Sequence, residues 1–309
     1  MNETALKTEN LTKEYRIRRR ERVRALDSFT IEVNAGETFG LLGPKGAGKT
    51  TFFKILLGLV RPTKGKAYLF GKEQRSWEIR RKIGFLAEES CFCDFLTGEE
   101  LLLYTGEIFG IPIGERRRRI DELLSLVGLE EVRKRKLRDY SQGMLRRIGI
   151  ARALINDPEL ILLDEPDSGL DPRSQKEIRS IITSLSGKGK TILIGSSHLL
   201  EIGGICDCVA ILYNGRVMRK GNLENLLKRG EGKKVTFRIE RKDVLNTIKA
   251  SYRSKEVNGE ITVYVPHQKA CDDIIGTILS KGGNIIKVED DQLSVEEIYE
   301  EESAGEIGV

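Results

Sequence analysis

The stretch Gly43-Pro-Lys-Gly-Ala-Gly-Lys-Thr50 combines glycines, a lysine and a hydroxyl group at fixed spacing. Glycines let the backbone curl so that successive N–H groups point at phosphate oxygens. Lys49 brings a positive charge to a bound phosphate chain, and the Thr50 hydroxyl is a ligand for Mg²⁺. Between a strand and a helix, such a stretch predicts a site for a nucleoside triphosphate. The predicted cofactor-binding residues here are Gly43, Pro44, Lys45, Gly46, Ala47, Gly48, Lys49, Thr50 and Thr51.

A second pattern, Leu160-Ile-Leu-Leu-Asp164-Glu165, places two carboxylates directly after four apolar residues. The apolar run predicts a buried strand, and open α/β sheets bind ligands at the carboxyl ends of their strands. Asp164 is expected to hold Mg²⁺ together with Thr50. Glu165 is expected to act as the general base that polarises the attacking water. Alone this pattern is ordinary, but with the phosphate loop it indicates hydrolysis of the bound phosphate chain.

The elements that must position these residues alternate between short apolar strands and helices through residues 5–220. This alternation is typical of an α/β domain with a mainly parallel central sheet. Residues from about 88 to 155 are almost all helical and predict a lobe inserted into the α/β core. The predicted strands are Leu6–Leu11, Phe29–Val33, Thr38–Leu42, Lys66–Phe70, Ile83–Leu86, Leu160–Asp164, Thr191–Ser196 and Val209–Tyr213, and the predicted helices are Lys49–Gly58, Gly98–Phe109, Glu115–Val127, Gln142–Ile155 and Arg173–Leu185.

A polar, glycine-containing break at Lys228–Lys234 indicates a second domain. We place the boundary so that residues 1–225 form the first domain and residues 226–309 a small α+β domain. Its predicted arrangement is βαββ-like, followed by a closing helix. The predicted elements are the strands Val235–Ile239, Ile261–Val265 and Asn284–Val288 and the helices Ala270–Leu279 and Ser294–Glu301.

Composition limits the class of protein. No run reaches 18 consecutive apolar residues, and the polar N-terminus lacks a signal core, so neither a membrane span nor a secretory signal is expected. The net charge of +5 is concentrated in Arg16–Arg24, Arg116–Arg119 and Arg133–Arg138. Acids flank each cluster, which favours solvated faces over contact with nucleic acid or an anionic membrane. The five cysteines include two C-x-C pairs without a nearby histidine, which favours reduced thiols over a zinc site.

Three further segments complete a familiar set. Tyr140-Ser-Gln-Gly-Met144 precedes Asp164, Ser168-Gly-Leu-Asp171 follows Glu165, and His198 follows the strand Thr191–Ser196. In this order, the set resembles the nucleotide-binding subunit of an ABC transporter over about residues 5–220. It is most similar to the separate ATPase subunits of efflux-type systems. The resemblance implies a P-loop NTPase fold, with a RecA-like core and an inserted helical subdomain, beside the small α+β domain.

The resemblance also implies roles for single residues. Tyr15 would stack on adenine, although ordinary packing is the alternative. Ser141 and Gly143 would reach the γ-phosphate held by another copy. His198 would contact the γ-phosphate and join Glu165 and Lys49 in catalysis, where the alternative is a surface or core histidine. Asp171 would communicate across the dimer; the alternative is a helix N-terminal turn before Pro172.

Three positions depart from the family pattern. Lys45 replaces the usual asparagine and adds charge near the phosphates. Gln142 replaces a glycine. Glu88 replaces the glutamine that senses Mg²⁺ and the membrane partner; a carboxylate still serves as a metal ligand, but it repels phosphate more strongly.

ATP and Mg²⁺ are therefore the expected cofactors. The phosphate loop has no second closing surface, and the segment at Ser141 starts a helix, which is a second anion site. Two copies facing head to tail would each close the other's ATP, and loss of the γ-phosphate would weaken that dimer.

The expected function is the ATP-hydrolysing motor of an exporter. The pore would be a separate polytopic membrane subunit, which would place the chain in the cytoplasm on the inner face of the membrane. Leu293–Tyr299 resembles the closing helix of efflux-type subunits, so the second domain is expected to be regulatory or dimer-stabilising. The alternative is a soluble ABC ATPase acting on nucleic acid or ribosomes, but nucleic acid is not the expected partner because such proteins usually carry two cassettes or large insertions.

Overall fold

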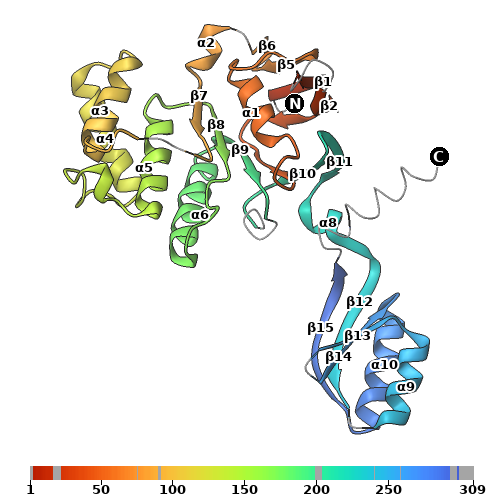
Figure 1. Cartoon of the computed structure of the whole chain (residues 1–309). Coiled ribbons are helices and arrows are strands. Elements are labelled where there is room, and N and C mark those ends of the chain that lie inside the picture. The colour runs from red at the N-terminus through yellow and green to blue at the C-terminus, as the bar shows by residue number, and fades with distance from the viewer. Residues whose placement is uncertain are drawn as a thin grey trace. The chain divides into compact units, whose positions relative to one another are not determined.

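The structure is a computed structural model that describes residues 3–16, 22–74, 76–89, 92–198, 204–239, 241–257, 259–292 and 298. The chain divides into two compact units, residues 1–223 and 224–309 (Figure 1). Each unit has a hydrophobic core of its own.

The larger unit is built around a six-stranded sheet in the order β11-β10-β4-β9-β8-β7. The strands from β10 to β7 run parallel, and β11 pairs antiparallel at the edge. Every residue of β4, β8 and β9 is buried, as their apolar runs predict for a parallel sheet covered on both faces. The predicted α/β class is confirmed. The strands are β4 (Thr38–Leu42), β7 (Ile83–Leu86), β8 (Leu160–Asp164), β9 (Thr191–Ser196), β10 (Cys208–Tyr213) and β11 (Arg216–Gly221).

A second, antiparallel sheet lies in the same unit, in the order β2-β1-β5-β6 with β3 beside β1. Helix α1 (Lys49–Leu56) contributes Phe52 and Phe53 to the core that both sheets share. The predicted strand Phe29–Val33 is wrong in extent. One strand ends at Phe29 and the next begins at Glu32. Between them the Thr30 hydroxyl, not a backbone carbonyl, accepts a hydrogen bond from the Asn10 N–H, so the regular strand pairing is interrupted there. The strands are β1 (Thr4–Arg16), β2 (Arg22–Phe29), β3 (Glu32–Asn34), β5 (Lys64–Leu69) and β6 (Lys72–Glu73).

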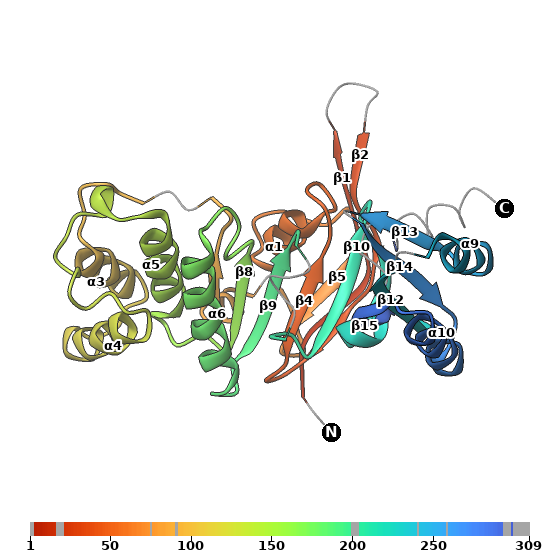
Figure 2. The same ribbon diagram turned by 90° about the horizontal axis from the view of Figure 1, so that it is seen from below.

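Three helices gather at one end of this unit, away from the antiparallel sheet (Figure 2). They are α3 (Gly98–Ile108), α4 (Ile113–Leu126) and α5 (Gln142–Leu154). Helix α3 begins at a capping box in which Thr97 and Glu100 exchange hydrogen bonds, and the described residues between positions 88 and 97 form no helix. Two helices outside this group are α2 (Trp77–Arg80) and α6 (Pro172–Ser186).

The smaller unit has the element order βαββαβ and one antiparallel sheet, β13-β14-β12-β15. Helix α9 and strand β13 were not predicted from the sequence, and the predicted break lies where β12 begins. The charged residues there are accommodated by cross-strand contacts, because Lys233 pairs with Asp290 and Lys234 lies over the Tyr264 ring. The elements are β12 (Lys228–Arg238), α9 (Lys242–Ser251), β13 (Ser254–Val257), β14 (Glu260–Val265), α10 (Gln268–Ser280) and β15 (Asn284–Gln292), and α8 (Leu223–Leu227) spans the division between the units.

The predicted closing helix at Ser294–Glu301, with the Leu293–Tyr299 segment, lies outside the described residues except for Ile298. Across the described ranges, no helix combines the length and the apolar character needed to cross a membrane.

Candidate nucleotide site

The phosphate loop connects β4 to α1 and depends on glycine at two close backbone approaches. Gly48 caps α1 with a φ of 112°, and a Cβ there would lie 2.3 Å from the Ala25 carbonyl oxygen. A Cβ at Gly43 would lie 2.4 Å from the Leu212 carbonyl oxygen of β10. Any side chain at either position would displace a neighbouring strand. The loop therefore curls tightly at the carboxyl edge of the central sheet, and the N-terminus of α1 faces its interior.

Lys49 is folded back into this loop. Its Nζ donates hydrogen bonds to the carbonyl oxygens of Gly43 and Pro44. The same atom lies 3.1 Å from Glu165 Oε1, and both side chains are almost completely buried. A lysine held this way is positioned for an anion inside the curl of the loop.

Thr50 and Asp164 meet at the base of the site. The Thr50 hydroxyl donates a 2.8 Å hydrogen bond to Asp164 Oδ2. Burial raises the pKa of Asp164 to about 6. The second carboxylate oxygen, Oδ1, is buried and has no hydrogen-bond partner among the described residues. An orphaned carboxylate oxygen beside a hydroxyl fits a divalent cation that prefers oxygen ligands.

Ser197, which was not predicted from the sequence, connects Glu165 to His198. Glu165 has a φ of 50°, and its Oε2 accepts 3.0 Å hydrogen bonds from both the backbone N–H and the hydroxyl of Ser197. The Ser197 hydroxyl lies 3.2 Å from His198 Nδ1. The only sequence signal for Ser197 is its place between the end of β9 and His198.

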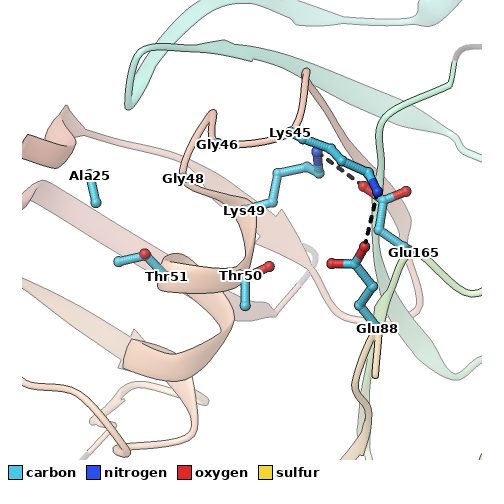
Figure 3. Close-up of a pocket in the computed structure, with 9 residues that line it drawn as sticks. All are labelled: Ala25, Lys45, Gly46, Gly48, Lys49, Thr50, Thr51, Glu88 and Glu165. Atoms are coloured by element: carbon cyan, nitrogen blue, oxygen red, sulfur yellow. Dashed lines mark ion pairs between the residues drawn. The ribbon is translucent and has the colours of Figure 1, made fainter. Parts of the chain in front are cut away.

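Lys45 and Glu88 face each other across the mouth of the site. Lys45 Nζ lies 3.6 Å from Glu88 Oε1 (Figure 3). Arg146 of α5, another residue missed from the sequence, donates hydrogen bonds to the carbonyl oxygens of Ala87 and Glu88 at 2.9 and 2.7 Å. Burial lowers the pKa of Arg146. The helical lobe is thereby tied to the segment that carries Glu88.

These segments enclose a cavity of about 180 Å³. Both ion pairs of the site lie within it, so its lining holds as many cationic as anionic side chains (Figure 3). The lining residues are Ala25, Lys45, Gly46, Gly48, Lys49, Thr50, Thr51, Glu88 and Glu165. Gly43 and Pro44 border it through the carbonyl groups that hold Lys49, and Ala47 is buried in the loop.

Nine predicted site residues are not among those that line this cavity. Five of them are described above: Gly43, Pro44, Ala47, Asp164 and His198. Tyr15 lies half-buried on β1, with Lys13 Nζ 4.9 Å from the centre of its ring. The other three, Ser141, Gly143 and Asp171, lie together at the starts of α5 and α6.

This second cluster is built by helix capping. The Ser141 hydroxyl accepts a hydrogen bond from the Met144 N–H at the start of α5. Asp171 caps α6 and accepts a 2.6 Å hydrogen bond from the Ser174 hydroxyl, which holds the pKa of this aspartate below its usual value. A Cβ at Gly143 would lie 2.4 Å from the Ser174 Oγ. Ser174 therefore joins the two helix starts, and the helix N-terminal turn considered for Asp171 is present.

Comparison with known proteins now identifies the family. The ABC transporter family model matches residues 26–168. An ABC transporter ATP-binding protein of Synechocystis is 47% identical over 220 residues, which are 71% of this chain and 62% of that relative. One from Nostoc is 40% identical over 288 residues, covering 90% of this chain and 83% of the relative. A bacitracin transport ATP-binding protein of Enterococcus faecalis is 32% identical over 304 residues, covering 96% of each.

Solved structures agree. The dimeric, post-hydrolysis ATP-binding cassette MJ0796, bound to ADP and phosphate, matches with a TM-score of 0.64 and 30% identity. The match covers 71% of this chain and 98% of that cassette. The chain therefore belongs to the ABC transporter family as one of its ATP-binding proteins, and its enzymatic activity is the hydrolysis of ATP.

Proposed function

We propose that two copies of this chain close head to tail around two ATP molecules and that this closure drives export through a separate polytopic membrane subunit. The observation that carries the proposal is the separation of two anion sites within one chain. Lys49 lies in the cavity, whereas Ser141 and Gly143 start a helix outside it. Each of these two anion sites is incomplete alone, and a second copy in the opposite orientation would complete both.

Within each copy of the chain, the residues of the cavity have distinct roles. Phosphates draw Lys49 from Glu165, which leaves the Glu165 carboxylate to accept a proton from the attacking water. Ser197 and Gly195 orient Glu165, through the 3.0 Å hydrogen bonds to its Oε2 and a 2.8 Å bond from its backbone N–H. His198 contacts the γ-phosphate, and Tyr15 stacks on adenine.

Mg²⁺ is assigned to the base of the same site. Thr50 and Asp164 would hold it, with Glu88 as a further ligand, and the orphaned Asp164 Oδ1 supports this assignment. Bound there, the ion supplies charge neutralisation to the phosphates. Ser141 and Gly143 of the second copy would close the γ-phosphate, and Asp171 would relay contact across the dimer.

A membrane subunit would dock on the helical lobe. Tyr104 and Ile108 lie four residues apart on α3 and are therefore neighbours on one helix face. Their exposed fractions are 62% and 66%. Exposed large apolar groups side by side are typical of a protein contact. This assembly would place the chain in the cytoplasm, against the inner face of the membrane, with residues 224–309 as an accessory domain.

Export is the direction that we infer from the resemblance to the ATPase subunits of efflux-type systems. The alternative role on nucleic acid gains no support from the arginine clusters. Arg116, Arg119 and Arg133 lie 3.1, 2.7 and 2.7 Å from Glu107, Glu115 and Asp121, respectively. Their charges are thus partly neutralised within the chain.

The test is the oligomeric state of the Glu165→Gln variant with ATP and Mg²⁺, measured by light scattering. Glu165→Gln should form a stable dimer with ATP and remain monomeric with ADP. Adding Ser141→Arg, which places a bulky side chain at the proposed contact, should prevent the dimer without changing ATP binding. A Glu165→Gln protein that binds ATP and remains a monomer would refute the closure model.

A further inference from the structure

Two ion pairs cross the nucleotide cavity, and they differ in burial. The pair of Lys49 and Glu165 is almost inaccessible to solvent. In the pair of Lys45 and Glu88, the side chains are 75% and 38% exposed. An exposed pair adds little to the stability of a fold. The pair of Lys45 and Glu88, called the outer pair below, therefore opens readily, and we expect it to affect ligand binding more than stability.

The backbones that carry the outer pair are both anchored. Arg146 holds the carbonyl groups of Ala87 and Glu88. Lys45 lies in the loop that is packed against β2 and β10 at Gly48 and Gly43. Opening the pair thus requires only rotation of two long side chains, without movement of either segment.

Bound phosphates would compete for one member of this pair. Lys45 and Glu88 both line the cavity that also contains Lys49 and Thr50 (Figure 3). A triphosphate carries several negative charges, whereas Glu88 offers one that is partly screened by water. Lys45 therefore gains more by turning to the phosphates than by remaining at Glu88.

We propose that Lys45 and Glu88 form an exchangeable ion pair. The pair closes the cavity when no nucleotide is bound, and the phosphates of a bound nucleotide open the cavity by drawing Lys45 away from Glu88. The proposal rests on the proposed function, since it assigns the phosphates to this cavity. Part of the attraction between Lys45 and ATP is used to separate the pair. Glu88 consequently weakens ATP binding by two routes, direct repulsion and competition for Lys45.

A double-mutant cycle separates these routes. The dissociation constant of ATP is measured by calorimetry in EDTA, where hydrolysis does not occur, for the wild type, Lys45→Met, Glu88→Gln and the double variant. Repulsion acts in both backgrounds, but competition requires Lys45. Glu88→Gln should therefore tighten ATP binding about threefold more with Lys45 present than in the Lys45→Met background, as a partly exposed ion pair allows. Raising the salt concentration should reduce this surplus.

The pair of Lys72 and Glu78 provides a matched control. It is also exposed and lies outside the cavity, with 3.2 Å between Lys72 Nζ and Glu78 Oε2. Lys72→Met and Glu78→Gln should leave ATP affinity unchanged, and melting curves check that every variant is folded. If Glu88→Gln changes ATP affinity equally in both backgrounds, the charges of Lys45 and Glu88 act independently. If it changes ATP affinity less with Lys45 present, Lys45 shields Glu88 permanently. Either result overturns the proposed exchange of Lys45 between Glu88 and the phosphates. A folded wild type that binds no ATP would overturn the proposed function as well.

Discussion

Lys49 Nζ and Glu165 Oε1 form a 3.1 Å ion pair whose side chains are only 5% and 3% exposed. A buried pair is strongly destabilised when one partner is removed, because the other charge stays in a medium of low polarity. Lys49→Ala should therefore lower the free energy of unfolding by about 3–5 kcal/mol as well as abolish tight ATP binding. Adding Glu165→Gln should recover much of that stability without restoring ATP binding. Urea unfolding checks both variants, and equal losses in the single and double variants would contradict the pairing.

Ser197 is predicted to position Glu165. Ser197→Ala removes the hydroxyl that bonds Glu165 Oε2 and lies beside His198, while the backbone N–H remains. Hydrolysis should fall by about tenfold or more, since a general base depends on its orientation, and ATP affinity should change little. Ser197→Thr keeps a hydroxyl and should recover part of the rate. Steady-state kinetics paired with calorimetry decides the matter; an unchanged rate in Ser197→Ala would exclude this role.

Gly143 is required by its contact with α6. A Cβ at this position would lie 2.4 Å from Ser174 Oγ and 2.9 Å from Ser174 Cβ. Gly143→Ala should cost about 1–3 kcal/mol of stability through overpacking. Gly114→Ala is the matched control, because that glycine lies in α4 with open space around it and should stabilise the protein by about 0.5–1 kcal/mol. Thermal unfolding of both variants tests the contrast, which fails if the two substitutions have the same sign.

The raised pKa of Asp164 predicts that the stability of the nucleotide-free protein depends on pH. Its folded-state pKa of about 6 lies above the ordinary value of 3.8 because the carboxyl is buried. Between these values the folded state binds more protons than the unfolded state, so its contribution to stability declines as pH rises from about 4 to 6. Asp164→Asn should flatten this dependence and stabilise the protein at pH 7.5 by about 1–3 kcal/mol. Urea midpoints in EDTA between pH 4 and 8 provide the measurement; a less stable Asp164→Asn protein at pH 7.5 would contradict it.

The two units are predicted to fold separately. The smaller one buries Val235, Phe237, Val263 and Ile274 within its own core. A protein ending after residue 223 should keep its melting transition and its ATP affinity, because the described residues that line the nucleotide cavity all belong to the first unit. Residues 224–309 expressed alone should show a cooperative unfolding transition. Calorimetry of the two fragments tests both expectations, and loss of ATP binding by the first fragment would contradict them.

The sequence was most informative where a pattern is local. The runs Leu160–Asp164 and Thr191–Ser196 are strands over those same bounds, because a strand buried on both faces is a nearly continuous apolar run in the sequence. Thr50 and Asp164 lie 114 residues apart in the chain and were predicted to share a site because each motif has one structural context; their side chains hydrogen bond.

The features that sequence analysis missed depend on contacts between distant segments. Helix α9 has a short amphipathic pattern that lies among charged residues, and its apolar side chains Val244 and Ile248 are recognisable as core only against β12 and β14. Arg146 reads as one more arginine of a helix until the fold brings it to the carbonyl groups of Ala87 and Glu88. Periodicity carries no information about which distant carbonyl group a side chain will meet.

The backbone of Ala25 holds three segments at a fixed separation. Its carbonyl oxygen would lie 2.3 Å from a Cβ at Gly48 and 2.8 Å from one at Gly215, so the phosphate loop and the turn after β10 both press against β2. Strand β2 in turn pairs with β1, where Tyr15 lies opposite Val23. The phosphate loop and the strand that carries Tyr15 are therefore connected through β2. A nucleotide that contacts both must span the distance between them, so nucleotides with longer or shorter spacers between base and phosphates should bind less tightly.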